Sequence, residues 1–71
     1  MKAMIFTTTS KTINIEKLTK IKCFDGQSSQ EFGIKDCTNF TLSEKIQYVF
    51  IGKNIVAISG ASILYVEFSE D

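Results

Sequence analysis

The sequence contains no histidine, proline, arginine or tryptophan, and only two of its 71 residues are cysteine. Histidine is the side chain that most often acts as a general acid or base near neutral pH, so its absence weakens every acid–base mechanism. It is also a common zinc ligand, and Cys23 and Cys37 do not form a CxxC pair. The four glycines are dispersed and form no phosphate-binding loop. We therefore expect a protein that is not an enzyme and that holds no metal and no cofactor.

The low cysteine content also bears on the compartment. Cys23 and Cys37 permit a single disulfide, and the sequence leaves open whether they ever pair. The first residues form no hydrophobic leader, so we expect a cytoplasmic protein, in which thiols stay reduced. Cys23 occupies an apolar position of an alternating pattern and is expected in the core, whereas Cys37 follows Asp36, which does not favour a thiolate.

Long hydrophobic runs are missing as well. The longest uninterrupted apolar runs have four residues, for example 48–51 and 55–58. A helix that crosses a bilayer needs roughly 20 apolar residues. We therefore expect no membrane-spanning segment.

The net charge is zero, although the charges are unevenly distributed. Residues 1–24 carry a charge of +4 and the remaining residues carry −4. Such an asymmetry bears on association and solubility rather than on the fold. All eight basic residues are lysine, which is typical of the coding bias of low-GC genomes. Short β proteins without net charge are common in bacterial genomes, so we expect a bacterial source.

Strand signals dominate what is present. Isoleucine, threonine, valine and aromatic residues are abundant, and apolar and polar residues alternate in several windows. Two segments, about 4–24 and 46–68, have the pattern of β-meanders, and the loop-rich segment 25–45 joins them. The sequence predicts one domain over residues 1–71 that is mainly β. We expect a small antiparallel meander or barrel-like domain of five to six short strands.

The segment 40–51 fits two patterns. Its even-numbered residues are apolar as in a strand, but Thr41 and Glu44 match a helix capping box and Gly52 matches a helix C-terminus. The aromatic and β-branched residues of 46–51 favour a strand there, with room for one helical turn near 42–46. The alternative is an α+β fold in which a helix at 42–51 packs on a sheet.

The segment 48–68 carries apolar residues on both faces of its expected strands, and a sheet with two apolar faces needs a cover on each. The middle segment of the chain has few apolar residues to supply the second cover. We therefore predict an interaction surface formed by Tyr48, Phe50, Ile63 and Tyr65. The expected function is a small non-enzymatic interaction or accessory module. It would act as a homo-oligomer, with a dimer as the first choice, or by binding another protein.

A second hypothesis rests on the basic residues near the N-terminus. In a strand, Lys20 and Lys22 share a face with Phe24, so two ammonium groups and one ring can follow a phosphate backbone and stack on a base. This pattern favours a single-stranded nucleic-acid-binding β-barrel as the alternative function. It is the weaker hypothesis, because a net charge of zero provides no long-range attraction to nucleic acid and alternating lysines also protect sheet edges from aggregation.

Overall fold

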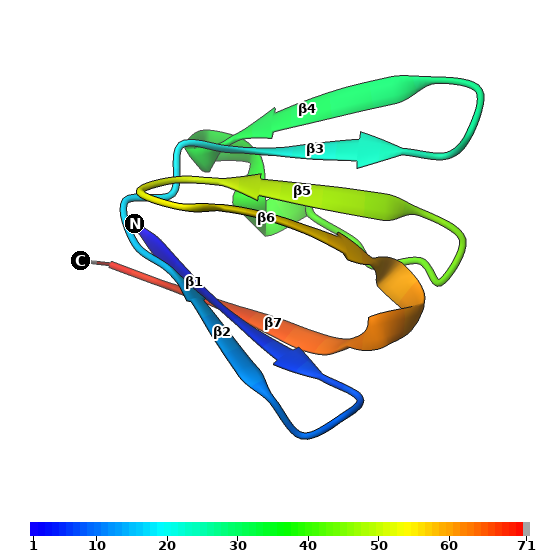
Figure 1. Cartoon of the computed structure of the whole chain (residues 1–71). Coiled ribbons are helices and arrows are strands. Elements are labelled where there is room, and N and C mark those ends of the chain that lie inside the picture. The colour runs from blue at the N-terminus through cyan, green and yellow to red at the C-terminus, as the bar shows by residue number, and fades with distance from the viewer. Residues whose placement is uncertain (71) are drawn as a thin grey trace.

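The chain folds into two antiparallel β-sheets that face each other (Figure 1). The computed structural model describes residues 1–70, with the side chains of residues 37–39 outside the description. The strands are β1 (Lys2–Thr7), β2 (Thr12–Ile15), β3 (Lys20–Phe24), β4 (Ser29–Gly33), β5 (Gln47–Ile51), β6 (Ile55–Ser59) and β7 (Ile63–Ser69). Two short 3-10 segments, η1 (Ile34–Asn39) and η2 (Gly60–Ser62), complete the described elements. The prediction of a mainly β, antiparallel fold is confirmed, with more strands than expected.

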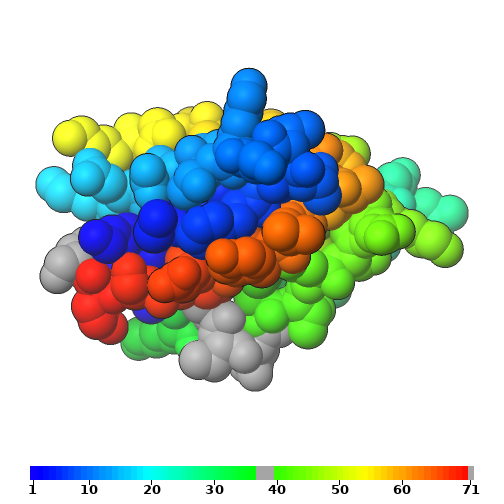
Figure 2. Space-filling model, turned by 90° about the horizontal axis from the view of Figure 1, so that it is seen from below, coloured from blue at the N-terminus to red at the C-terminus, as the bar shows by residue number. Residues whose placement is uncertain are grey.

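The two segments that look like separate meanders in the sequence do not form separate sheets. The three-stranded sheet has the order β2-β1-β7, and the four-stranded sheet has the order β4-β3-β5-β6. Strands from the two ends of the chain, β1 and β7, therefore lie side by side, as the blue and orange-to-red surfaces in Figure 2 show. Each sheet contains strands from both segments, so neither segment buries its apolar face without the other.

The hairpin turns follow from local polar chemistry. In the turn between β1 and β2 the Thr7 hydroxyl accepts from the Lys11 amide at 3.0 Å, and Ser10 adopts a φ of 67°. Between β3 and β4 the Asp25 carboxylate accepts from the amides of Gln27 and Ser28 at 2.9 and 2.8 Å. Side-chain bonds of this kind replace backbone partners that a tight turn leaves unpaired.

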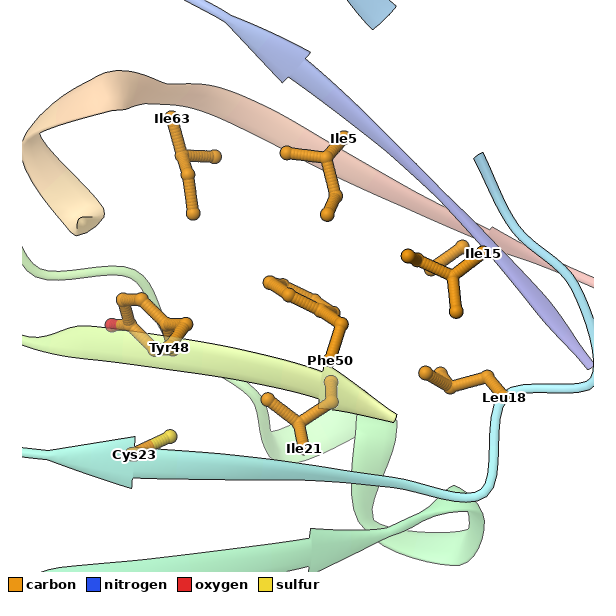
Figure 3. Close-up of a cluster of buried hydrophobic side chains, with 9 residues drawn as sticks. Ile5, Ile15, Leu18, Ile21, Cys23, Tyr48, Phe50 and Ile63 are labelled. Atoms are coloured by element: carbon orange, nitrogen blue, oxygen red, sulfur yellow. The ribbon is translucent and has the colours of Figure 1, made fainter. Parts of the chain in front are cut away.

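The core lies between the two sheets (Figure 3). The largest fully buried side chains come from both sheets and from the connection before β3: Ile5, Ile15, Leu18, Ile21, Tyr48 and Phe50. On the inner face of the four-stranded sheet, Ile21 pairs with Phe50 and Cys23 with Tyr48. The two aromatic rings of β5 therefore sit at the centre of the molecule.

The helix alternative for residues 42–51 is wrong. Residues 47–51 form β5, which pairs with β3 on one side and β6 on the other, and its burial alternates with a period of two. Residues 44–45 form a turn in which the Ile46 amide donates to the Ser43 carbonyl at 3.2 Å, so the expected helical turn near 42–46 is reduced to this turn. The described residues contain no α-helix. Two ladders of hydrogen bonds and a shared inner face outweigh the local capping signal.

One ring from the loop-rich segment closes the side of the core next to β7. Phe40 makes edge contacts with Phe32, Tyr48, Phe50 and Phe68, with ring centroids 5.4 to 6.2 Å apart. These partners come from β4, β5 and β7, so Phe40 contacts both sheets. The segment that the sequence gives as loop-rich thus supplies part of the core.

Candidate interaction surface

Three of the four residues predicted to face a partner are buried inside this chain. Tyr48 and Phe50 are 0% exposed and Ile63 is 7% exposed, whereas Tyr65 is 48% exposed. For the three buried residues, the expectation of an exposed surface is corrected. Tyr48 and Phe50 are buried because side chains alternate between the two faces of β5. Both faces are apolar as expected, but the face that carries these two residues is the one turned toward the other sheet.

The position of Ile63 has a different cause. In the pairing of β7 with β1, Phe6 lies opposite Tyr65 and Thr7 lies opposite Ile63, so Leu64 is an extra residue at a β-bulge. The bulge turns Ile63 toward the core and leaves Leu64 63% exposed. Strict alternation puts Leu64 inside and Ile63 outside, which is the reverse of what the structure has. Tyr65 stays outside and stacks on Phe6 with centroids 4.3 Å apart.

The hydroxyl of Tyr48 joins the core to the connection before β5. It accepts from the Ser43 amide at 2.9 Å and donates to the Thr41 carbonyl at 3.1 Å. Burial of the ring raises the pKa of Tyr48 above its ordinary value of 10.0. The neutral phenol is thus the form that the fold stabilises, and it has a structural role.

Tyr48→Phe is expected to lower the free energy of unfolding by about 1–3 kcal/mol, because the Ser43 amide loses its acceptor. A tyrosine whose folded-state pKa is raised contributes fully below the unfolded pKa of about 10, and this contribution is lost as the pH rises from there through the folded pKa. The stability gap between wild type and variant should therefore narrow from about pH 8 to about pH 11. Urea unfolding at both pH values measures the gap, and a constant gap would contradict the assigned role.

The structure brings Lys20, Lys22 and Phe24 onto one face, the outer face of β3. Glu31 of β4 lies beside both lysines, with its Oε1 3.8 Å from the Lys20 Nζ and 3.6 Å from the Lys22 Nζ. Phe24, which follows the two lysines on this face, is 39% exposed. The expected geometry is present, but the carboxylate of Glu31 offsets part of the positive charge. The sequence pattern alone does not indicate this ion pairing.

Two open hollows lie at the β3–β4 end of the molecule. The larger, of about 360 Å³, is lined by Phe24 and the turn residues 26–29, and the smaller, of about 170 Å³, includes Cys23, Gln30 and Ile46.

Two titratable groups near these hollows have shifted pKa values. Hydrogen bonds from the Ser28 and Gln27 amides lower the pKa of Asp25, and the same bonds hold the turn between β3 and β4. Burial raises the pKa of the Cys23 thiol, so the protonated and less nucleophilic form is favoured.

Chemical groups for a metal site do not converge in the part of the chain that the structure describes. No three histidine, cysteine, aspartate or glutamate side chains come together in residues 1–70, with the side chains of 37–39 left aside. The Cys37 side chain, and with it the question of a bond to Cys23, lies outside the described residues. Within the same part of the chain, no helix has the length and apolar character needed to cross a bilayer.

Besides Phe24 of β3, apolar residues reach the surface of the four-stranded sheet on β5 and β6. By register, Val49 is opposite Ala57 and Ile51 is opposite Ile55, and these four form the outer rows of the two strands. Ile55 is 68% exposed. The sequence contained this signal, because residues 47–51 have two apolar rows, but it did not show which row faces inward.

β6 is also the border of its sheet, because β5 is its one paired neighbour among the described strands (Figure 1). Its five residues, Ile55–Ser59, contain no charge, proline or glycine. Below, "the β6 border" means the unpaired side of these five residues.

The comparisons with known proteins give no match: no family model, no curated protein and no solved structure is similar to this chain. Function is therefore inferred from the chain's own residues.

Proposed function

We propose that this chain is a non-enzymatic interaction module that associates with a second copy of itself through the β6 border. The observation that carries the proposal is an unprotected border strand. Exposed sheet borders usually carry charges, proline or a bulge, which prevent pairing with another strand. β6 has none of these, and its Ile55 is the most exposed of the large hydrophobic residues in the described chain.

The other three borders of the two sheets are protected. β4 carries Glu31, which pairs with two lysines, and β7 carries Glu67 together with the bulge at Leu64. β2 contains no charge of its own, but the turn before β6 occupies its end, where the Lys53 amide donates to the Glu16 carbonyl at 2.7 Å. The contrast makes β6 the border best suited to accept a strand. A second copy is the partner that fits, since the net charge of zero opposes no self-association.

Apolar side chains on both faces of β6 are incompletely buried, so a strand of a second copy could cover them. On the inner face, Val56 and Ile58 pack against the core but are only half-buried, because they lie at its margin. On the outer face, Ile55 and Ala57 are exposed. Burial of apolar surface stabilises an association by about 25 cal/mol per Å². A strand paired with the β6 border would therefore bury apolar surface on both faces of the sheet.

Sedimentation tests the proposal directly. The wild-type chain is expected to sediment with at least twice its mass of 8.0 kDa at high concentration. Ile55→Lys removes the most exposed apolar side chain and places a charge at the border, so it should shift the equilibrium toward the monomer by tenfold or more, or about 1.4 kcal/mol.

The matched control is Leu64→Lys, which introduces the same charge at a position that is 63% exposed on the other sheet. This variant should sediment like the wild type. A wild-type chain that remains a monomer at the highest concentration reached would overturn the proposal, and so would equal effects of the two variants.

The column of Lys20, Lys22 and Phe24 is a weaker basis for a nucleic-acid function. Two ammonium groups and one ring do lie on one face, as that function requires. Both ammonium groups, however, lie within 4 Å of Glu31, and the net charge is zero. The β6 border has no comparable opposing feature.

A further inference from the structure

We infer that the second copy pairs antiparallel with β6 about a twofold axis at Ala57, which joins the two four-stranded sheets into one continuous sheet. This inference rests on the proposed self-association and specifies its geometry. A strand can pair with its own copy around a twofold axis only in the antiparallel direction, and such symmetric contacts are the commonest in soluble oligomers.

The alternation of side chains fixes where the axis passes. Residues opposite each other in a ladder point to the same face of the sheet, and side chains alternate between faces along each strand. The twofold axis must therefore lie level with one residue, which then faces its own copy, and not level with a peptide bond between two residues. An axis at Ala57 pairs all five residues of β6, with Ile55 opposite Ser59 of the second copy and Val56 opposite Ile58. An axis at Val56 or Ile58 leaves two of the five residues without a partner.

The pairing about Ala57 completes the cover of the inner face. Val56 and Ile58 are half-buried at the margin of the core, and in the pair each Val56 meets the Ile58 of the other copy. Side chains directly opposite each other in an antiparallel pair are close enough to contact, so this apolar pair stabilises the association. Each copy thus supplies the side chains that the other copy lacks at the edge of its core.

The charges and contacts around β6 are compatible with this register. Lys53, the nearest charge before β6, falls opposite Ala61 of the second copy, and its Nζ already lies 3.9 Å from the Oε2 of Glu16. The hydrogen bonds that tie β2 to this region involve Lys53 and Asn54, before β6 begins. Among the described residues, no strand pairs with the β6 border. No like charges meet across the axis.

Single cysteines test the register. The experiment uses the full chain with Cys37→Ser as the background. Cys23 is kept, because its side chain is buried and this burial raises the pKa of its thiol. Opposite residues in an antiparallel pair have Cα atoms about 4.5–5.5 Å apart, which a disulfide can bridge. On mild oxidation Ala57→Cys should therefore form a covalent dimer, seen as a doubling of mass on a non-reducing gel.

Two further variants serve as matched controls. Ile55→Cys and Ser59→Cys should each remain monomeric on the gel, because two copies of either residue are about 13 Å apart in this register. A mixture of the two variants should form a covalent dimer, because residue 55 of one copy faces residue 59 of the other. The background chain should show no covalent dimer.

The outcomes separate the inference from the proposed function. Covalent dimers of the Ala57→Cys variant and of the mixture, without dimers of the two single controls, support the register. A wild-type chain that sediments as a dimer while Ala57→Cys stays uncrosslinked, or while Ile55→Cys alone crosslinks, overturns the register and leaves self-association intact. A wild-type chain that sediments as a monomer overturns both.

Discussion

Gly60→Ala is expected to lower the free energy of unfolding by more than about 3 kcal/mol, at the upper end of what overpacking costs. Gly60 is buried, and a methyl group added to it would overlap the carbonyl oxygen of Ser43 and approach that of Ile46 to 2.9 Å. Both obstacles are backbone atoms, which cannot rotate away as a side chain can. The Gly60 amide also donates to the Ile46 carbonyl at 2.8 Å, so a shift of the chain would break this bond.

The measurement is thermal or urea unfolding beside Gly33→Ala as the control. A methyl group at Gly33 meets nothing within 4 Å, and the φ of Gly33 is not in the left-handed region. This control should be within about 1 kcal/mol of the wild type, because alanine restricts the unfolded chain at a compatible position. A loss of 3 kcal/mol lowers the melting temperature of a domain of this size by roughly 12–24 °C. Equal stability of the two variants would contradict the close contact.

Phe50→Ala should lower the free energy of unfolding by about 3–5 kcal/mol. Phe50 is fully buried at the centre of the core, where it contacts Phe40 and pairs with Ile21 across the ladder. Removing the ring takes away its transfer free energy and leaves a cavity between two sheets that cannot collapse fully. Since domains of this size have a total stability of roughly 4–11 kcal/mol, the variant is expected to lose much of its folded population at 37 °C.

Phe24→Ala is the matched control, because the residue has the same chemistry on the neighbouring strand but is 39% exposed on the outer face. Its loss should cost about 1 kcal/mol or less. Far-UV circular dichroism during urea unfolding measures both variants. If Phe50 instead formed part of an exposed surface, as the sequence pattern had suggested, Phe50→Ala would leave the urea midpoint near that of wild type and change only the sedimented mass.

Strands could be predicted from the sequence because their signals are local. Alternation and turn residues indicated strands along 4–24 and 46–68, and the structure has them. The choice between strand and helix at 42–51 was not local, since the capping pattern of Thr41 and Glu44 competed with the strand pattern. The ladders on both sides of β5 decided it.

The candidate surface was predicted less well, for two physical reasons. An alternating strand with two apolar rows does not show which row faces the core, so Tyr48 and Phe50 were assigned to the surface instead of Val49 and Ile51. A β-bulge reverses the phase of a strand without a distinct signal in the sequence, and the bulge at Leu64 moved Ile63 inside. Lys20, Lys22 and Phe24 share one face as predicted, but the approach of Glu31 depends on the pairing of β3 with β4.

The sequence by itself determined that this chain is mainly β, since period-two alternation and the absence of proline are properties of single segments. Only the tertiary structure decided which strands share a sheet, which row of β5 is buried and which border is left unprotected. The reason is that these properties depend on contacts between residues far apart in the chain, such as the pairing of β1 with β7. A single segment carries its own periodicity, but not the identity of its neighbour.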